Sequence, residues 1–419
     1  MAGRIEEADV LVLGAGIVGV SIATHLQMRG RQTILVDRGG PGEGTSFGNA
    51  GLIQREAVFP HLFPRDLGEL LRYALNLKTE AHYSATMLPH LLGPFLRYWY
   101  HSETGRYLAI SRDYARLIAH CVEDHLALAK LAGAEDILRP GGWTMAHRDQ
   151  RSFARTLKEA EAARREFGVD YDVWCGNELA AAEPHLAPGL AGGLHWTQPV
   201  AVLDPHALTL AYTAYFKSLG GRIERGDARR LQRGGPGWEV ADETAMFRGR
   251  DAVVALGAWS TEVTKPLGYD PPMFVKRGYH MHYRPDGNAG LNHPVFDVSH
   301  GYMLAPMRRG IRLTTGAEFA HRDAPPTPVQ LARVEPLARG LMPDLGRRLD
   351  PEPWLGSRPC TPDMLPIIGP APGQGGLWFG FGHGHQGLTL GPTTGRMLAA
   401  MMTGEEPFTD PAAFRPDRF

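Results

Sequence analysis

The sequence is poor in cysteine and nearly balanced in charge. Its three cysteines, Cys121, Cys175 and Cys360, are too widely spaced for a close-set metal or redox motif, so we expect no metal site and a reducing compartment. The formal net charge of −1 gives no electrostatic case for nucleic acid binding. The sequence has no uninterrupted apolar helix of about 20 residues, and residues 1–8 lack the apolar core of a secretory signal. We therefore expect a cytoplasmic location without a membrane-spanning segment.

Charge is also absent from one long internal stretch. Residues 364–395 contain no Asp, Glu, Lys or Arg, yet they are rich in glycine. This combination is expected where the chain wraps closely around a large and mostly apolar ligand. Within the stretch, a glycine-rich loop over 380–389 leads into an expected helix over 393–402. A buried turn region without a ligand is the alternative interpretation.

The N-terminal segment carries the most informative motif. The apolar run Val10–Leu13 is followed by Gly14, Gly16 and Gly19 in the pattern G-x-G-x-x-G and by an expected helix over 18–27. A second apolar run over 33–36 then ends at Asp37. In a dinucleotide site such glycines permit a tight turn, close approach of the backbone to a pyrophosphate and close packing of helix on strand, while the acid accepts hydrogen bonds from a ribose. This order of strand, glycine loop, helix, strand and acid predicts dinucleotide binding. A purely structural turn is the alternative interpretation.

Six ordered blocks of sequence together carry a family resemblance. They are the N-terminal fingerprint with Asp37; Gly44-Thr-Ser-x-x-Asn49-Ala-Gly51; Ala255-Leu-Gly257-Ala-Trp-Ser260; Lys276-Arg-Gly-Tyr279; the run from Trp354 to Gly369, which includes Gly356, Arg358 and Asp363; and Gly382-His383-Gly384-x-x-Gly387-Leu-Thr389. With these blocks nearly the whole chain resembles the D-amino-acid oxidase-like flavoproteins, and most closely the bacterial D-amino-acid dehydrogenase branch. The resemblance implies non-covalently bound FAD, with the last loop returning to the flavin ring.

The resemblance also implies a fold. We expect an α/β FAD-binding Rossmann-like domain plus an α+β substrate domain with a mixed or antiparallel sheet. The FAD-binding domain is expected from 1–60, 190–262 and 350–405, the substrate-binding domain from 61–189 and 263–349, and a C-terminal tail over 406–419. The expected cofactor contacts are Gly14, Ala15, Gly16, Ile17, Val18, Gly19, Asp37, Arg38, Gly44, Thr45, Ser46, Asn49, Ala50, Gly51, Leu52, Gly257, Trp259, Gly384, His385, Gln386, Gly387, Leu388 and Thr389.

Arg358, Tyr302 and His385 are the expected catalytic residues. Oxidation of an amino acid moves a hydride from Cα to flavin N5, and a bidentate arginine suits the substrate carboxylate. Arg358 lies at the edge of the charge-free stretch and in the Gly-x-Arg-Pro element of the family; a structural ion pair with Asp363 is the alternative. Tyr302 is expected to cover the substrate or bond its carboxylate, or else to be a core tyrosine. His385 is expected to contact the substrate or the reduced ring, or else to be structural.

The implied function is FAD-dependent oxidative deamination or dehydrogenation of a D-amino acid, including a cyclic one of the D-proline type. Quinone, a dye-like carrier or oxygen is the expected electron acceptor. The alternatives are a glycine- or sarcosine-type secondary amine oxidase of the same fold, a nicotinamide-dependent dehydrogenase, and a flavin-bearing subunit of an electron-transfer complex. Covalent attachment of flavin to Cys360 fits the family element poorly. Aromatic residues cluster over 87–100, which we interpret as a packed helix, with peripheral contact to a membrane or quinone pool as the alternative.

Overall fold

The N-terminal segment forms the centre of a mainly parallel sheet. The computed structural model describes residues 4–74, 76, 79–83, 87–242 and 245–419. Strand β1 pairs in parallel with β2 and β13, and β13 pairs in parallel with β22. The described strands of this sheet are β10 (Arg222–Arg225), β2 (Thr33–Asp37), β1 (Arg4–Leu13), β13 (Ala245–Val254), β12 (Gly237–Ala241) and β11 (Gln232–Gly234) in spatial order, with β22 (Leu377–Phe381) on β13 and β21 (Ile367–Pro370) on β22.

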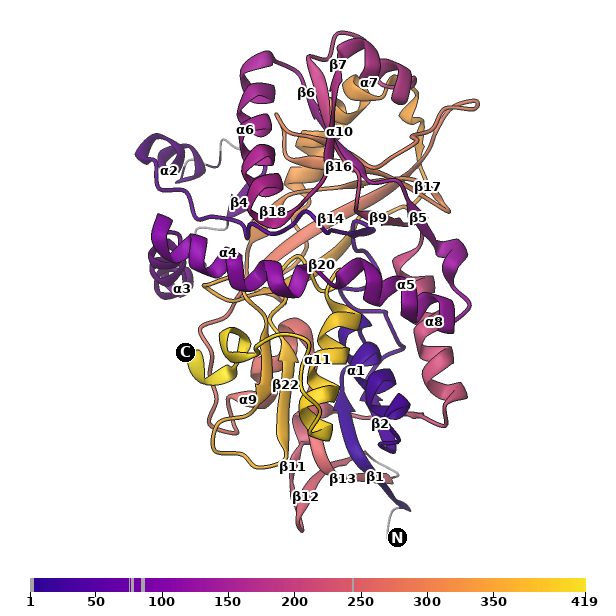
Figure 1. Ribbon diagram of the computed structural model, residues 1–419, viewed down its shortest axis with the longest axis vertical. Helices are drawn as coiled ribbons and strands as arrows, with labels where there is room; N and C mark the ends of the chain where they lie inside the picture. Colours follow the sequence, from indigo (N-terminus) through magenta and orange to yellow (C-terminus); the bar gives the residue numbers. More distant parts are fainter. Residues whose placement is uncertain (1–3, 75, 77–78, 84–86, 243–244) are drawn as a thin grey trace.

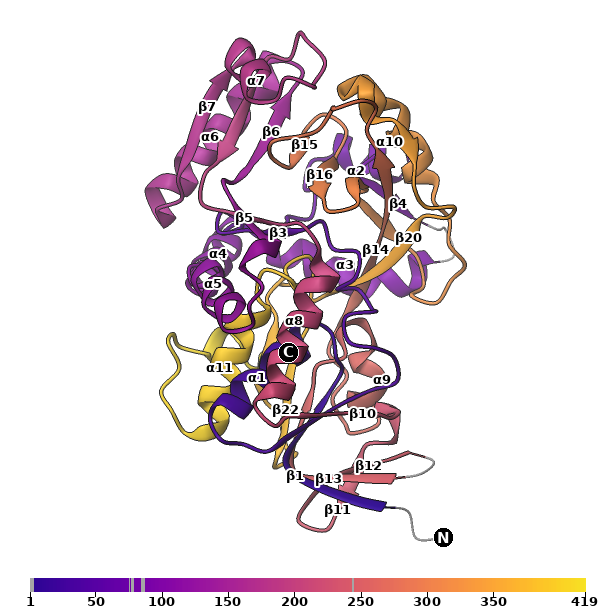
Figure 2. The ribbon, with the colours of Figure 1, turned by 90° about the vertical axis from the view of Figure 1, so that its right-hand side faces the viewer.

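A second, mainly antiparallel sheet stands at the other end of the molecule (Figures 1 and 2). Its described strands, in order, are β4 (Ala81–Tyr83), β18 (Ala317–Phe319), β14 (Phe274–Arg284), β17 (Gly310–Thr314), β16 (Tyr302–Met307), β15 (Val295–Asp297), β6 (Trp143–His147), β8 (Gly192–Trp196) and β7 (Tyr171–Cys175), with β19 (Arg347–Arg348) and β20 (Trp354–Cys360) also on β14. A small third sheet contains β3 (Leu52–Ile53), β9 (Val200–Val202) and β5 (Leu138–Pro140). One mainly parallel and one mainly antiparallel sheet confirm the expected fold class.

Helices from opposite ends of the chain cover the parallel sheet. In Figure 1 the indigo α1 (Ile17–Met28) lies beside the yellow α11 (Gly391–Thr403), and α8 (Pro205–Ser218) also packs on α1. The other described α-helices are α2 (Leu67–Ala74), α3 (Leu88–His101), α4 (Thr104–Ile118), α5 (Cys121–Leu131), α6 (Gln150–Phe167), α7 (Gly176–Ala182), α9 (Ser260–Thr264) and α10 (Val329–Leu341). None of these described helices is both long and apolar enough to cross a membrane.

Local sequence explains where several elements begin and end. Asp204 caps α8, because its carboxylate accepts a hydrogen bond of 3.0 Å from the backbone N–H of Ala207, and Pro205 occupies the first helical position. Gly220 follows the helix with a φ of +90°, which a side chain disfavours. The predicted helix over 18–27 is α1, and the predicted strand over 33–36 is β2, which continues through Asp37.

Strand β14 corrects one expectation. The alternation over Val275–Tyr283 predicts a half-buried strand, but β14 is buried at most of its positions. Both faces are covered: Met281 and Tyr283 join the hydrophobic cluster under α10, and Phe274 joins an aromatic cluster with Tyr98 of α3. A strand buried on both faces shows no clean alternation of exposure, so polar residues of β14 are inside the protein.

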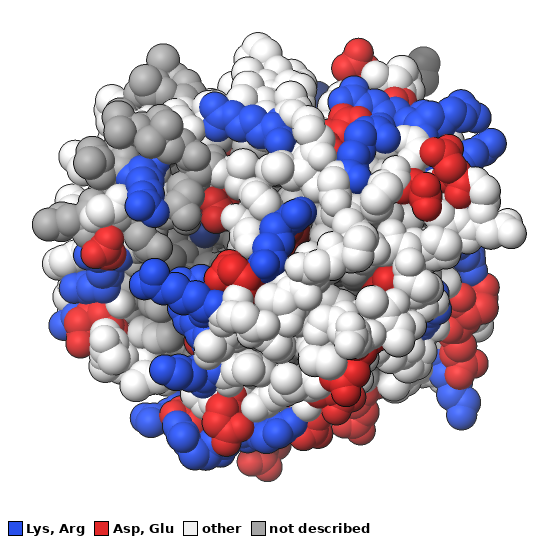
Figure 3. All heavy atoms as spheres, turned by 90° about the horizontal axis from the view of Figure 1, so that it is seen from above, with Lys and Arg blue, Asp and Glu red and all other residues white. Residues whose placement is uncertain are grey.

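The expected domain boundaries stay a prediction. Strands β8 and β20 lie in segments assigned to the FAD-binding domain, yet both pair within the antiparallel sheet. Charged side chains of both signs are interspersed over the face seen in Figure 3, and no large field of one sign dominates it. This distribution agrees with the nearly neutral composition.

Candidate active site

A cavity of about 810 Å³ runs between the glycine loop of the parallel sheet and strands β14 and β20 of the antiparallel one. Its walls include most of the expected cofactor residues, which come together from distant parts of the sequence. They are Gly14, Ala15, Gly16, Ile17, Val18, Asp37, Arg38, Gly44, Thr45, Ser46, Asn49, Ala50, Leu52, Gly257, Trp259, Gly384, His385, Gln386, Gly387 and Leu388. Arg358 also lines the cavity.

The glycine loop is shaped as a dinucleotide site requires. Gly14 has a φ of +107°, and a Cβ there would lie 2.6 Å from the carbonyl oxygen of Ala255. The carboxylate of Asp37 accepts a hydrogen bond of 2.7 Å from the N–H of Ala15, and the hydroxyl of Ser46 accepts one of 3.0 Å from the N–H of Ile17. The loop is therefore held open beside the N-terminus of α1, where backbone N–H groups favour phosphate.

Gly19, Gly51 and Thr389, three of the expected cofactor residues, do not line the cavity. A Cβ on Gly19 would lie 1.8 Å from the carbonyl oxygen of Gly14, so this glycine allows helix and strand to pack closely, as the motif predicts. Gly51 has a φ of +76°, and its Cβ would lie 2.6 Å from the carbonyl oxygen of Val202. The hydroxyl of Thr389 donates to the carbonyl of Leu52 at 3.2 Å, which joins the C-terminal loop to β3.

One end of the cavity gathers charged side chains around an indole ring. The guanidinium carbons of Arg38 and Arg322 lie 5.6 Å and 5.3 Å from the ring centre of Trp259. Arg322 also pairs with Glu262. Since Asp37 stands at the same end, after β2, this is the end suited to the adenosine half of a dinucleotide. Sequence reasoning did not find Arg322, which lies in a loop without a motif.

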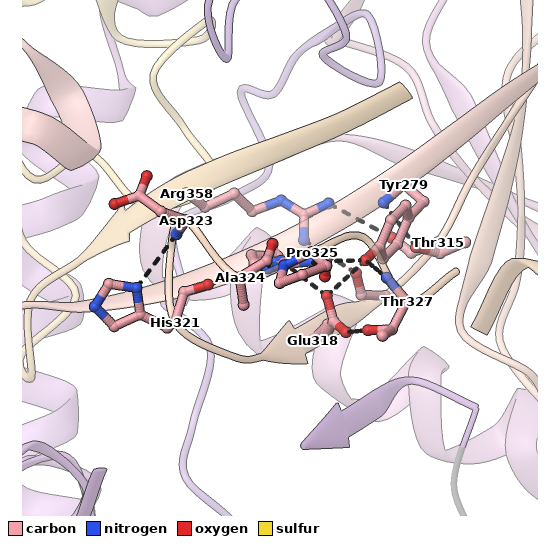
Figure 4. Close-up of polar contacts among 11 residues, drawn as sticks. Tyr279, Thr315, Glu318, His321, Asp323, Ala324, Pro325, Thr327 and Arg358 are labelled. Carbon is pink, nitrogen blue, oxygen red and sulfur yellow. Dashed lines mark hydrogen bonds and ion pairs between the residues drawn. The ribbon is translucent and has the colours of Figure 1, made fainter. Parts of the chain in front are cut away.

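A buried ion-pair network fixes the loop that carries Arg322. Arg277, which is fully buried, lies 2.9 Å from Glu318 and donates to the carbonyl oxygens of His321, Ala324 and Pro325. The hydroxyl of Tyr279 donates to Glu318 at 2.8 Å. Figure 4 shows these groups converging beside Arg358. The second basic residue of the Lys276-Arg-Gly-Tyr279 block is thus structural.

Arg358 presents an unpaired cation to the cavity. Its guanidinium donates to the carbonyl oxygens of Gly316 at 3.0 Å and Thr315 at 3.5 Å, and it has no acidic partner among the described residues. Asp363 pairs instead with Arg418 at 2.8 Å, so the alternative of an Arg358–Asp363 ion pair is wrong. Burial lowers the pKa of Arg358 from its usual value. A half-buried guanidinium that lines a cavity without a counter-charge favours an anionic ligand.

Two neutral imidazoles stand near this guanidinium. The ring centres of His61 and His385 are 4.7 Å apart, and both rings line the cavity. Desolvation within the cavity lowers the pKa of His61, an exposed residue, to about 4 and that of His385, which is half-buried, well below its usual value, with nearby cations adding to both shifts. At neutral pH both rings are uncharged, so they can donate or accept hydrogen bonds without adding positive charge.

The structure does not bring Tyr302 to the cavity. Tyr302 is fully buried in β16, in the hydrophobic cluster with Leu304 and Val295, and it is absent from the cavity wall. Burial raises the pKa of its phenol, and the neighbouring Asp297 adds to this shift. Tyr302 therefore occupies the position of a core tyrosine, which was the alternative interpretation of its sequence.

Gln54, Glu56 and Tyr114 are among the wall residues that were not anticipated from the sequence. Gln54 accepts a hydrogen bond of 3.0 Å from Gln386 of the C-terminal loop and donates one of 2.8 Å to Glu56. Their chain positions belong to no motif, and only the packing of α4 and the segment after β3 brings them together.

None of the described cysteines is part of the cavity wall. Cys121 and Cys360 are fully buried, and Cys175 is exposed. No group of histidine, cysteine and acidic side chains among the described residues could hold a metal ion. A dinucleotide in this cavity would therefore find no cysteine positioned for a covalent link.

Comparison with known proteins agrees with this geometry. The family model of FAD-dependent oxidoreductases, DAO, matches residues 9–401. The D-amino-acid oxidase of Bradyrhizobium diazoefficiens is 28% identical, over 99% of each chain. The glycine oxidase of Pseudomonas aeruginosa is 29% identical, over 97% of this chain and 98% of the other. The crystal structure of glycine oxidase from Geobacillus kaustophilus shares the fold, with a TM-score of 0.76, 22% identity and 99% coverage of each chain.

The matched segment contains the glycine loop, Arg358 and the C-terminal loop. This protein belongs to the FAD-dependent oxidoreductase family DAO.

Proposed function

We propose that this protein oxidises the Cα–N bond of a D-amino acid. The observation that carries the proposal is Arg358, a half-buried guanidinium that lines the cavity and has only carbonyl oxygens as described partners. A substrate carboxylate would supply the missing counter-charge. The D configuration is supported by sequence relatives named D-amino-acid oxidase and D-amino acid dehydrogenase, at 28% to 29% identity. A cyclic substrate of the D-proline type remains within this proposal.

The cofactor is FAD, held non-covalently, and when bound it accepts the hydride from the substrate. The glycine loop and Asp37 would hold its adenosine and pyrophosphate half, and the loop over 384–388 would lie against its ring end. Arg358 would orient the substrate by its carboxylate. The neutral rings of His61 and His385 would bond the substrate or cofactor without competing for that carboxylate. The imine product would then hydrolyse in water to the 2-oxo acid, or persist if it is cyclic.

Dye reduction with a panel of D- and L-amino acids tests the proposal. We expect at least one D-amino acid to reduce an artificial acceptor through the FAD-loaded protein, and its L-enantiomer to be much slower. Turnover of L-amino acids alone would overturn the D assignment. Activity of the isolated chain would also argue against the alternative of a subunit that works only within an electron-transfer complex.

A glycine- or sarcosine-type amine oxidase is the second candidate. It is supported by the glycine oxidase relative, which is 29% identical. Glycine and sarcosine therefore belong in the same panel, and a clear preference for them would favour this candidate.

The electron acceptor is a separate question. Phe95 and Tyr98 of helix α3 pack in an aromatic cluster, as predicted for a packed helix. On the same helix, Leu92 is 62% exposed and Leu96 is 59% exposed. This exposed strip supports peripheral contact with a membrane or quinone as a further proposal. Oxygen consumption measured beside dye and quinone reduction would rank the three acceptors.

A further inference from the structure

Glu56 is a buried acid whose second oxygen has no protein partner. The side chain is 7% exposed and lines the cavity. Its Oε1 accepts hydrogen bonds of 2.8 Å from Nε1 of Trp143 and 2.8 Å from Nε2 of Gln54. Its Oε2 is buried and makes no hydrogen bond to any described residue. Two donors thus fix the carboxyl group and leave one oxygen for a ligand in the cavity.

Of the described charged wall residues, only two lie away from the adenosine end. The other charged wall residues lie at the adenosine end of the cavity, around Trp259. They are the charged residues at and just after the ends of β2 and β10, together with Glu262 and Arg322. The remaining charged wall residues are Glu56 and Arg358. They carry opposite charges and face the same space, so together they are complementary to a ligand with an anionic and a cationic end.

The two charges are too far apart for one α-amino acid head group. They form no ion pair with each other, and four strands of the antiparallel sheet, β14, β17, β16 and β15, lie between β20, which carries Arg358, and β6, whose Trp143 donates to Glu56. Tyr114 is buried and also lines the cavity. A substrate carboxylate and α-ammonium are separated by one carbon only, so they cannot reach both charges.

We propose that Glu56 binds a cationic group at the end of the substrate side chain, and that the substrate is a basic amino acid. The inference rests on the proposed function, because it places the substrate carboxylate on Arg358. The side chain would pass Tyr114 and bring a terminal ammonium or guanidinium group to Oε2 of Glu56. Burial raises the pKa of Glu56 to about 7, which a bound cation would counteract.

Binding of two non-oxidisable carboxylates tests the inference without turnover. The compounds 6-aminohexanoate and hexanoate differ only in the terminal ammonium group, and neither has an α-amino group. Each is titrated into the full-length FAD-loaded protein and followed by the flavin absorbance spectrum. We expect wild type to bind 6-aminohexanoate at least about tenfold more tightly, the lower end for a charged hydrogen bond. Glu56→Gln should reduce the ratio of the two Kd values to about one.

The control variant is Glu123→Gln, an exposed position on the neighbouring α5, which should keep the wild-type ratio. Equal Kd values in wild type, or a ratio that survives Glu56→Gln, would overturn the inference. Glu56→Asp keeps the charge on a shorter side chain, so it should shift the preference toward 7-aminoheptanoate. An unchanged length preference in Glu56→Asp would also overturn it, even if Glu56→Gln fails to fold.

Turnover separates this inference from the proposed function. In the dye assay, wild type should prefer lysine to norleucine, its analogue without the terminal amine, and Glu56→Gln should slow lysine alone. An equal loss on both amino acids would mean that Glu56 acts on a group common to all substrates, and would overturn the side-chain role. If no amino acid is oxidised, the proposed function fails, whereas the Kd ratio still decides whether Glu56 binds a cation.

Discussion

Gly278 leaves open the space that the guanidinium of Arg358 fills. A Cβ at position 278 would lie 2.5 Å from Nη2 of Arg358, although the residue paired with Gly278 across the strands is Gly356. Lys276, two positions earlier on the same face of β14, is the residue paired with Arg358. The glycine of the Lys276-Arg-Gly-Tyr279 block thus determines where the cation of the site can lie.

We expect Gly278→Ala to displace the guanidinium and weaken carboxylate binding. The clash is with the end of a flexible side chain, so the melting temperature should change little while kcat/KM falls about tenfold or more. FAD content and amino-acid kinetics check both expectations. Gly340→Ala in α10, where a Cβ would meet nothing within 4 Å, is the matched control. Unchanged kinetics in Gly278→Ala would show that the guanidinium position is not limiting.

Arg358→Lys should keep a positive charge but lose the two-point contact with a carboxylate. A charged hydrogen bond contributes roughly 1.5–3 kcal/mol, so kcat/KM should fall at least about tenfold. FAD content should stay at the wild-type level, because Arg358 is bonded to Gly316 and Thr315 rather than to the glycine loop. Kinetics equal to wild type on every substrate would remove Arg358 from the substrate site.

Gly16→Val should abolish retention of FAD. Even a Cβ at this position would lie 3.3 Å from Oγ of Ser46, the group that bonds the N–H of Ile17, and the rest of the valine would fill the space for the pyrophosphate. The ratio of flavin to protein absorbance after purification measures the loss. Gly290→Val, at an open position, should keep full flavin. Acid precipitation of wild type should release all flavin into the supernatant.

Glu56→Gln should become more stable relative to wild type as the pH rises from 5 to 8. The pKa of Glu56 is raised to about 7 in the folded protein, mainly by burial, from 4.5. Between these values the folded protein holds a proton that the unfolded chain has lost, so the stability of wild type falls with rising pH. The difference should reach on the order of 3 kcal/mol at pH 8. Melting temperatures of both proteins across this pH range test it, and a constant difference would contradict the raised pKa.

Glu318→Ala should destabilise the fold severely, because it leaves the charge of Arg277 buried without a counter-charge, with carbonyl oxygens among its remaining partners. Arg277 is 0% and Glu318 2% exposed, and loss of one partner of such a pair typically costs about 3–5 kcal/mol. Urea unfolding measures the loss. The double variant Arg277→Met with Glu318→Leu removes both charges and should recover much of it. A single variant as stable as wild type would mean that solvent reaches Arg277.

The sequence predicts the cofactor half of the site far better than the substrate half. Gly14, Gly19 and Asp37 act within one short strand–loop–helix unit, so spacing along the chain already implies their contacts. Arg358 could be found because it stands in a family element beside a charge-free stretch. Tyr302 lies in an apolar strand whose sequence fits a core position and a site wall equally well. Glu56, His61 and Tyr114 line the cavity only because distant segments pack there, and no local pattern records that packing.

The order of strands in the parallel sheet bears on how the protein is made. β1 leaves the ribosome first, yet its neighbour β13 begins at Ala245, and β22 begins at Leu377. Until most of the chain has been translated, the glycine loop has no Ala255 to rest against, and β1 has an open edge that invites pairing with other chains. A nascent chain released early would contain the complete glycine motif with Asp37, but it would lack the later segments that complete the dinucleotide site. Flavin capture would thus have to wait for the loop over 384–388, and products truncated before it would be colourless and prone to aggregate.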